Sequence, residues 1–367
     1  MTKVLELINF YSLDEIEAYI DRGGTYPLHH IWGYDQIRKA GYPVGCVEYD
    51  KGSYLNKLGR VLRIGNLQQQ INCIRKAKDY DLIFAPFMND TLFLAFLKTL
   101  KLYRKPMLVV AQHAYVPTHH NPLKRLKELM VRFFFFNGVD RILFLNQNIY
   151  NRSNIYALLS TRHDFIRSWG VDVDFFSEYT KGQHLPPSND YIFSTGGTNR
   201  DFNTLIEAFN HLDFKLKITA KEDFTNEIRA KVTPNVEIDT SVVPGLTSVA
   251  RLRSDYYNSL AVAIPILVEE DHNPSGVTVL FEAAALAKPI ITTWNKSYPF
   301  DVEKEKIGFN VNYGDSEGWK QAVQYMTDHR DEAREMGERA RHLCKTKYNY
   351  KLFSQEIIRN IEYLSMK

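Results

Sequence analysis

Short apolar runs alternate with longer segments of helical periodicity through the first half of the chain. We expect strands at 4–11, 43–49, 82–87, 107–112 and 141–146. Between them, the spacing of apolar positions predicts helices at 30–40, 67–78, 91–102 and 122–137. Regular alternation of strand and helix predicts a doubly wound parallel sheet.

A polar segment that contains two adjacent prolines, residues 181–190, interrupts this pattern and is typical of a linker. In the second series that follows, we expect strands at 191–194, 214–218, 236–238, 261–267 and 289–293. We expect its helices at 202–212, 315–329, 331–348 and 350–364. The chain is therefore predicted to form two α/β units across a cleft, with ligand sites at the carboxyl ends of their strands.

The composition narrows the class of protein. With 367 residues, 44% hydrophobic and 24% charged, the chain can bury two ordinary cores. Its three scattered cysteines show no metal-like spacing and favour a reducing compartment. Early acidic residues argue against a signal peptide, and no apolar run approaches the roughly 20 residues of a membrane span. We expect a cytoplasmic protein.

The charge is unevenly distributed. Residues 1–172 hold 23 basic and 15 acidic residues, a net charge of +8, and the remainder holds 23 and 28, a net charge of −5. Within the first part, residues 51–141 hold 16 basic and 5 acidic residues, a net charge of +11. Such a local field indicates an anionic substrate, a membrane surface or a solvated face without a partner. No nucleic-acid-binding module accompanies it.

The stretch NPSGVTVLFEAAALAKPIITT, residues 273–293, places one acid inside an Ala-rich helix. The amides of Gly276, Val277 and Thr278 would begin this helix and suit a diphosphate. Glu282 has apolar neighbours, and a buried carboxylate needs a partner. It could accept two hydrogen bonds from a ribose diol, or it could be a surface residue of an amphipathic helix.

The segment SGVTVLFEAAALAKPIIT resembles the nucleotide-sugar motif of retaining glycosyltransferases of family four, which have the GT-B fold. Other segments resemble further motifs of that family in the same order: MLVVAQHAY, WGVDVDFF, GGTNRDFNTLIEAF and KLFSQEIIRNIEYL. The resemblance covers nearly the whole chain. It implies two Rossmann-like domains, 1–175 on the acceptor side and 176–348 on the nucleotide-sugar side. A terminal helix, 349–367, would return to the first domain.

The resemblance also implies roles for single residues. Glu282 matches the acid that binds the nucleotide ribose, and Arg200 matches a base on the donor diphosphate. His113, which follows an apolar strand, matches a histidine at the sugar ring or acceptor. The implied donor-binding set is Gly23, Gly24, Gly197, Asn273, Ser275, Gly276, Val277, Thr278 and Glu282.

Two positions depart from the family pattern. Thr198 stands where a second arginine is usual, and Lys221 is our candidate replacement. Pro274 stands where the family often has a glutamate on the transferred sugar, so Asn273 or His272 is expected to take the sugar hydroxyls.

Asp172 and Asp174 form a DxD pair in the segment between the domains. We expect this segment to be a turn that an aspartate caps, and we expect no metal. The resemblance to GT-B enzymes also implies that no cofactor is needed beyond a nucleotide-diphosphate sugar donor, because in such enzymes basic groups and a helix N-terminus neutralise the leaving diphosphate.

The resemblance therefore implies a metal-independent glycosyltransferase, specifically a hexosyltransferase, that retains the anomeric configuration. The acceptor is a small molecule, a glycan or a lipid-linked compound. The alternatives are a nucleotide-sugar epimerase of the same architecture and a non-catalytic partner subunit.

The segment NPLKRLKELMVRFFFFNG sets four bases beside Phe133–Phe136. This mixture suggests peripheral contact with an anionic membrane at its inner face. Four consecutive aromatic residues cannot all face lipid, however, so we expect most of them in the core.

Overall fold

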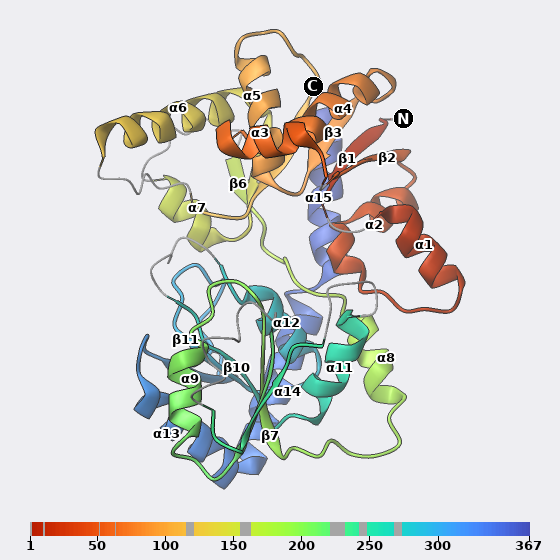
Figure 1. Cartoon of the computed structure of the whole chain (residues 1–367). Coiled ribbons are helices and arrows are strands. Elements are labelled where there is room, and N and C mark those ends of the chain that lie inside the picture. The colour runs from red at the N-terminus through yellow and green to blue at the C-terminus, as the bar shows by residue number, and fades with distance from the viewer. Residues whose placement is uncertain are drawn as a thin grey trace. The chain divides into compact units, whose positions relative to one another are not determined.

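The computed structural model of the chain (Figure 1) describes residues 2–9, 12–50, 52–62, 64–114, 121–154, 163–220, 232–241, 248–267 and 274–367. The chain divides into two compact units. The first comprises Met1–Glu15, Leu28–Trp169 and Tyr350–Lys367, and the second comprises Ile16–Pro27 and Gly170–Asn349. The division at residues 169 and 170 falls a few residues before the position 175 that we expected from the sequence.

The first unit is built on a six-stranded sheet in the order β2-β1-β3-β4-β5-β6, and every pair is parallel. Its strands are β1 (Val4–Ile8), β2 (Val44–Glu48), β3 (Leu82–Ala85), β4 (Met107–Ala111), β5 (Arg141–Phe144) and β6 (His163–Phe165). Its helices are η1 (Leu28–Ile31), α2 (Tyr34–Lys39), α3 (Tyr54–Leu62), α4 (Leu67–Lys76), η2 (Ala77–Asp79), η3 (Met88–Thr91), α5 (Leu92–Thr99), α6 (Pro122–Gly138), α7 (Gln147–Asn154) and α15 (Tyr350–Ser365). Helix α1 (Leu13–Asp21) begins in this unit and ends in the second.

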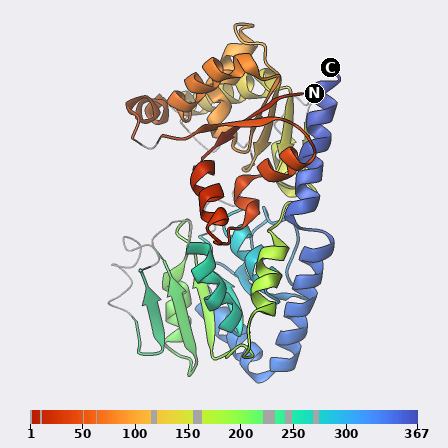
Figure 2. The same ribbon diagram turned by 90° about the vertical axis from the view of Figure 1, so that its right-hand side faces the viewer.

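The second unit has a six-stranded parallel sheet in the order β12-β11-β10-β7-β8-β9. Its strands are β7 (Tyr191–Thr195), β8 (Lys215–Thr219), β9 (Val236–Asp239), β10 (Ala261–Ile264), β11 (Ile290–Thr293) and β12 (Gly308–Val311). Its helices are α8 (Val173–Lys181), α9 (Phe202–Phe209), α11 (Ser248–Asn258), α12 (Val277–Ala285), α13 (Ser316–Asp328) and α14 (Arg330–Thr346). Figures 1 and 2 show helices on both faces of this sheet.

The central strands are buried along their whole length because helices cover both faces of each sheet. Strands β1, β3, β4, β10 and β11 have no exposed or half-buried residue. This is why their sequences are nearly continuous apolar runs rather than alternating ones. In the second unit, α9 and α13 pack against one face around Phe209, Trp319 and Met326.

The expected helix at 30–40 is interrupted. The turn η1 ends at Ile31, and α2 begins only at Tyr34. Trp32 and Gly33 between them have positive φ angles of 49° and 109°, which a right-handed helix cannot include. The expectation was wrong here because apolar spacing does not report backbone handedness.

Helix α15 belongs to the first unit although it follows the whole second unit in sequence, as Figure 2 shows at the C-terminus. It packs against α2 and β3. Its Glu356 accepts hydrogen bonds from the Arg167 amide, at 3.0 Å, and from the Ser168 hydroxyl. This arrangement confirms that the terminal helix returns to the first domain.

Each sheet changes its direction of winding once. In the first sheet the chain adds β2 on one side of β1 and then β3 on the other. In the second it adds β8 and β9 on one side of β7 and then β10 on the other. In such sheets the loops diverge at this switch point and leave a crevice at the carboxyl ends of the two strands. Ligand sites are therefore expected after β1 and β3, and after β7 and β10.

Candidate functional site

The loop after β7 is shaped around one arginine. Arg200 folds back over the loop and donates from Nε to the Thr195 carbonyl, at 3.1 Å, and from Nη1 to the Thr198 carbonyl, at 2.8 Å. A Cβ on Gly196 would lie 2.4 Å from Arg200 Nη2, and Gly196 has φ of +123°. Only glycine gives the guanidinium this space. The loop therefore holds the cation at the carboxyl edge of the sheet.

Arg200 is a buried cation without a carboxylate partner. It is 6% exposed, and within the described residues it forms no ion pair. Burial lowers its pKa, and the nearby Tyr298 and Tyr256 oppose that shift. A guanidinium stays protonated even so, because its ordinary pKa is above about 12. Among the described residues, the hydrogen bonds that Arg200 donates go to backbone carbonyls, which leaves this edge suited to an anion.

A tight turn lies next to this loop. Gly276 has φ of +87°, and a Cβ there would lie 2.6 Å from Ile264 Cγ2 and 2.7 Å from Tyr298 Oη. Tyr298 fixes the turn by donating from its hydroxyl to the Ser275 carbonyl, at 2.9 Å. Asn199 Nδ2 donates to Ser275 Oγ, at 3.2 Å, and so joins the turn to the arginine loop.

The turn begins helix α12. Gly276 is its N-cap, and no side chain of the described residues caps it. The Val277 amide donates to the Pro274 carbonyl, at 3.1 Å, so that amide is engaged within the turn. Ser275, Gly276 and Thr278 are half-buried at the positive end of the helix. Arg200 and the N-terminus of α12 thus lie at one edge of one sheet.

Glu282 is buried on α12, with 6% of its surface exposed. The hydroxyl of Tyr256, from α11, donates to Glu282 Oε2 at 2.8 Å. Burial raises the pKa of Glu282 to about 7, and the tyrosine hydrogen bond opposes this shift. Tyr256 therefore explains in part how an Ala-rich helix tolerates an acid.

The other expected site residues are spread over both units. His113, half-buried, follows β4 in the first unit, at the carboxyl edge of its sheet. Gly197 is exposed in the arginine loop. Lys221 and Asn273 lie outside the described residues, as does His272.

Gly23 and Gly24 terminate α1. Gly23, with φ of +83°, donates to the Ile20 carbonyl at 2.9 Å, and Gly24 donates to the Tyr19 carbonyl at 3.0 Å. This is a common way for a helix to end in the left-handed region. A Cβ on Gly24 would lie 2.5 Å from the Tyr19 ring. Helix termination and packing therefore account for both glycines.

Asp172 has a structural role. Its side chain accepts a hydrogen bond from the Phe175 amide, at 3.2 Å, and caps α8. Asp174 lies in the first turn of the same helix, where a negative charge is favoured. The expectation that an aspartate caps this segment is confirmed for Asp172.

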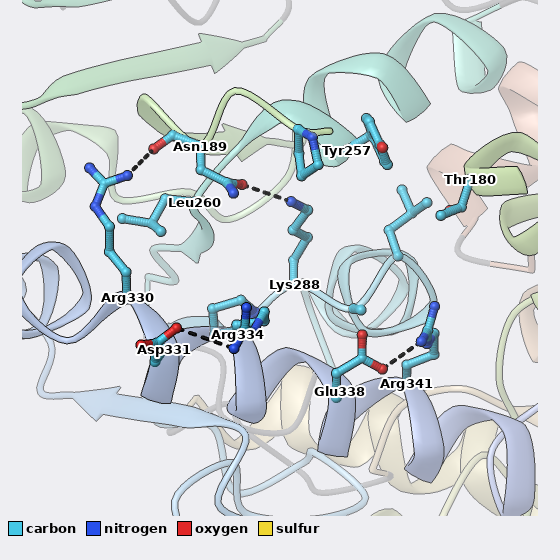
Figure 3. A pocket seen from close by; sticks show the side chains of 14 residues that line it. Thr180, Asn189, Tyr257, Leu260, Lys288, Arg330, Asp331, Arg334, Glu338 and Arg341 are labelled. Atoms are coloured by element: carbon cyan, nitrogen blue, oxygen red, sulfur yellow. Dashed lines mark hydrogen bonds and ion pairs between the residues drawn. The ribbon is translucent and has the colours of Figure 1, made fainter. Parts of the chain in front are cut away.

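A cavity of about 360 Å³ lies at the opposite edge of the second sheet (Figure 3). Asn189, Leu260 and Pro289, which precede β7, β10 and β11, line it. Lys288 Nζ donates to the Ser259 carbonyl, at 2.7 Å, and to Asn189 Oδ1, at 3.2 Å. Because this edge is formed by amino ends of strands, it is not where a doubly wound sheet places its ligand.

Comparison with known proteins identifies the fold. The chain has a TM-score of 0.75 with sucrose-phosphate synthase from Thermosynechococcus elongatus, at 13% identity, with 99% of each chain covered. It has a TM-score of 0.66 with HepE from Anabaena, solved with UDP and glucose, at 14% identity, covering 99% of this chain and 100% of that one. It has a TM-score of 0.59 with UDP-N-acetylglucosamine 2-epimerase from Rickettsia bellii, at 11% identity, covering 100% of this chain and 98% of that one.

No family model and no curated protein matches the chain. The class is set by the fold: two parallel six-stranded sheets with helices and the return helix α15 form the GT-B fold, as the sequence predicted. The solved structures that share this fold include GT-B glycosyltransferases.

Sequence reasoning missed three residues that build the site. Tyr256 binds Glu282, Tyr298 fixes the Ser275 carbonyl, and Asn199 joins the two loops. Each lies far in sequence from its partner. Of these three residues, only Asn199 could have been suspected from the local sequence. Its φ is +50°, and asparagine adopts positive φ more readily than most residues do.

We predict that Tyr256→Phe destabilises the protein in a pH-dependent way. The lost hydrogen bond stabilises the ionised form of Glu282, so its contribution is present above pH 7 and disappears as pH falls through the pKa of about 7. Urea unfolding at pH 8, one unit above that pKa, should show a loss of about 1 kcal/mol, and unfolding at pH 5.5 should show a smaller loss. Tyr257→Phe is the matched control, because its hydroxyl bonds the Leu185 carbonyl at an exposed position. Equal losses at both pH values would contradict the assignment.

Proposed function

We propose that the chain is a retaining, metal-independent glycosyltransferase of the family-four type that transfers a sugar from a nucleotide diphosphate to an acceptor hydroxyl. The observation that carries this proposal is Arg200, a buried cation without a carboxylate partner among the described residues. It lies at the switch point of the second sheet beside the N-terminus of α12. Both groups attract a diphosphate. HepE, which shares the fold, was solved with UDP-glucose.

Glu282 would bind the nucleotide ribose. Its carboxylate follows the helix N-terminus by six residues, which suits a nucleotide whose diphosphate lies at the start of the helix. Tyr256 holds one carboxylate oxygen in place from the α11 side. The two ribose hydroxyls would donate hydrogen bonds to the carboxylate oxygens of Glu282.

In the proposed reaction, the acceptor hydroxyl would attack the anomeric carbon of the donor sugar on the same face from which the diphosphate leaves. The leaving phosphate would help remove the acceptor proton. Arg200, Lys221 and the amides of the α12 N-terminus would stabilise the charge that develops on it. His113 would contact the sugar or the acceptor. The diphosphate charge is met by protein groups, so the reaction takes no metal cofactor.

An epimerase is the second candidate, because UDP-N-acetylglucosamine 2-epimerase has the same fold. Incubation with UDP-sugars and chelator, without acceptor and then with a glycan or lipid extract, separates the candidates. Acceptor-dependent release of UDP in chelator supports the transferase. Interconversion of the sugar without release of UDP identifies an epimerase, and binding without turnover identifies a partner subunit.

We expect Glu282→Gln to weaken the binding of UDP by about 1.5–3 kcal/mol, because a hydrogen bond to a charged acceptor is lost. Calorimetric titration at pH 8 measures the change. Glu207→Gln is the control, since Glu207 is exposed on α9 of the same unit. Unchanged affinity in a folded Glu282→Gln variant would remove Glu282 from the nucleotide site.

Arg200→Ala should lower the turnover number by about 10²–10³ and raise the Michaelis constant for the donor much less, because diphosphate charge grows in the transition state. Steady-state kinetics of the variant provide the measurement. Arg330→Ala at the opposite edge of the sheet should leave both constants unchanged. Normal turnover in Arg200→Ala would exclude this residue from the mechanism.

A membrane is the partner that we propose for the first unit, at the cytoplasmic face. Helix α6 exposes Leu123, Leu126, Met130 and Phe133, each by more than half of its surface. Exposed Lys124 and Arg125 flank this stripe. Within the described residues, no helix is long and apolar enough to cross a membrane. Apolar side chains with adjacent bases are typical of a helix lying on anionic lipid.

Two observations refine this proposal. Phe135 is fully buried, and Phe134 and Phe136 pack on Phe96 and Phe144, so most of the phenylalanine run is core, as expected. Arg132, which we had counted among the surface bases, is also buried. The membrane surface therefore rests on leucines and a methionine that the sequence analysis did not single out. Helix α3 adds exposed Tyr54 and Val61 within the same basic region, 51–141.

Leu123→Glu should reduce sedimentation with vesicles that contain phosphatidylserine, because it places a negative charge in the apolar stripe. Leu185→Glu is the control, since both leucines are 78% exposed and Leu185 belongs to the second unit. Binding of the wild type should weaken with salt. Equal binding to neutral phosphatidylcholine vesicles would contradict an anionic membrane partner.

A further inference from the structure

A second polar cavity, of about 440 Å³, lies at the switch point of the first sheet. Asn9 directly follows β1, and Asp90 lies in the turn that follows β3. This is the ligand edge of a doubly wound sheet. The volume is within the range of small-molecule sites, about 300–1,000 Å³.

Asp90 lines this cavity and is 2% exposed. Asn66 Nδ2 donates to Asp90 Oδ1 at 2.6 Å, and Asn9 Nδ2 donates to Asp90 Oδ2. Burial raises the pKa of Asp90 to about 7, and the two amide hydrogen bonds oppose this shift. Near neutral pH the carboxyl group is therefore present in both forms, and its protonated form can also donate a hydrogen bond.

The two asparagines bond Asp90 and leave other hydrogen bonds unmade, which costs folding free energy. Asn66 is the N-cap of α4, where its side chain would normally accept a backbone amide, yet it makes no capping bond. Asn56 Oδ1 accepts the Gln68 amide instead, at 2.9 Å. Asn9 Oδ1 is buried, and within the described residues no donor reaches it. A buried acceptor without a donor costs about 1–3 kcal/mol unless a ligand or water supplies one.

The remaining wall gives the cavity its shape. Gly65 has φ of +78°, and a Cβ there would lie 1.6 Å from the Asn89 carbonyl oxygen. Only glycine therefore allows the two backbone segments to approach so closely in the cavity wall. Phe87 also lines the cavity, and its ring packs edge-on against Trp32. Arg60, exposed on α3, lines it and forms no ion pair within the described residues.

We propose that this cavity binds a polyhydroxylated ring, either a free sugar or a sugar or polyol headgroup, through Asp90, Asn9, Asn66 and Arg60. Treating this ring as the acceptor rests on the function proposed above. Carboxylate oxygens, which accept, and side-chain amides, which accept and donate, match hydroxyl groups, and Phe87 and Leu92 add apolar residues to the lining. A buried carboxylate would repel a diphosphate, so this cavity is not a second donor site.

Saturation-transfer NMR on the full-length protein, without nucleotide, tests the proposal with glucose, N-acetylglucosamine and myo-inositol as probes. At least one should bind, and Asp90→Asn should weaken it about tenfold or more, the effect of one hydrogen bond to a charged group. Arg60→Gln should weaken the same ligand. Lys57→Gln, an identical change of charge on α3 at a position that does not line the cavity, should not.

A parallel experiment separates free sugars from lipid headgroups. Vesicles with phosphatidylinositol are compared with vesicles of equal charge that contain phosphatidylserine. A preference for phosphatidylinositol that Arg60→Gln abolishes and Lys57→Gln keeps supports the headgroup, whereas binding of free probes alone supports a soluble sugar. If no probe binds by either route, or if binding survives both Asp90→Asn and Arg60→Gln, the proposal is wrong.

UDP titration of the same samples distinguishes this failure from failure of the proposed function. UDP binding with no sugar binding would overturn only the cavity assignment. Sugar binding without UDP binding would keep the cavity and overturn the transferase. The Arg60→Gln variant should retain the wild-type affinity for UDP, because Arg60 and Arg200 belong to different units.

Discussion

A parallel strand can be followed by another only through a crossover that returns to the same end of the sheet, and this constraint sets where the polar groups of the molecule gather. In each sheet the crossovers run first to one side of the opening strand and then to the other. The loops that follow the two central strands therefore diverge, and buried polar residues can lie in the crevice between them. Arg200 and the α12 turn occupy this position in the second sheet, and Asp90 with its two asparagines occupies it in the first.

The two switch points differ in the sign of the charge that they bury. Arg200 is compensated by backbone carbonyls, whereas Asp90 is compensated by side-chain amides. Within the part of the chain that the structure describes, each arrangement buries an ionisable group without an ion-pair partner, and an ion pair would cancel the field that a ligand meets. The first therefore favours an anion, and the second favours hydroxyl groups.

The sequence was sufficient for most of the fold because the central strands are buried on both faces. A run such as MLVVA at 107–111 has few alternatives to a buried parallel strand, and its position was predicted to within a residue. Exposed, amphipathic α3 and α11 were not predicted, since their apolar stripes are short and interrupted by polar residues.

Glu282 and Arg200 were singled out from local motifs. Tyr256 and the Asp90 cluster were not, because pairs separated by 26 or 81 residues leave no local pattern.

Net charge alone would place an anion in a different part of the chain from the one that we propose. Residues 173–367 carry an excess of acids, yet they contain the buried guanidinium and the open helix N-terminus. Surface acids on α13 and α14 are exposed and screened over about 8–10 Å at ordinary salt, so they act weakly on a buried site.

The excess of bases lies instead in residues 51–141, where apolar side chains of α3 and α6 are exposed as well. A soluble anion needs no such apolar surface, whereas a lipid bilayer with acidic headgroups matches both properties at once. The functions that we propose therefore assign the two kinds of positive charge to different partners: the buried guanidinium to a diphosphate, and the exposed bases to a membrane surface.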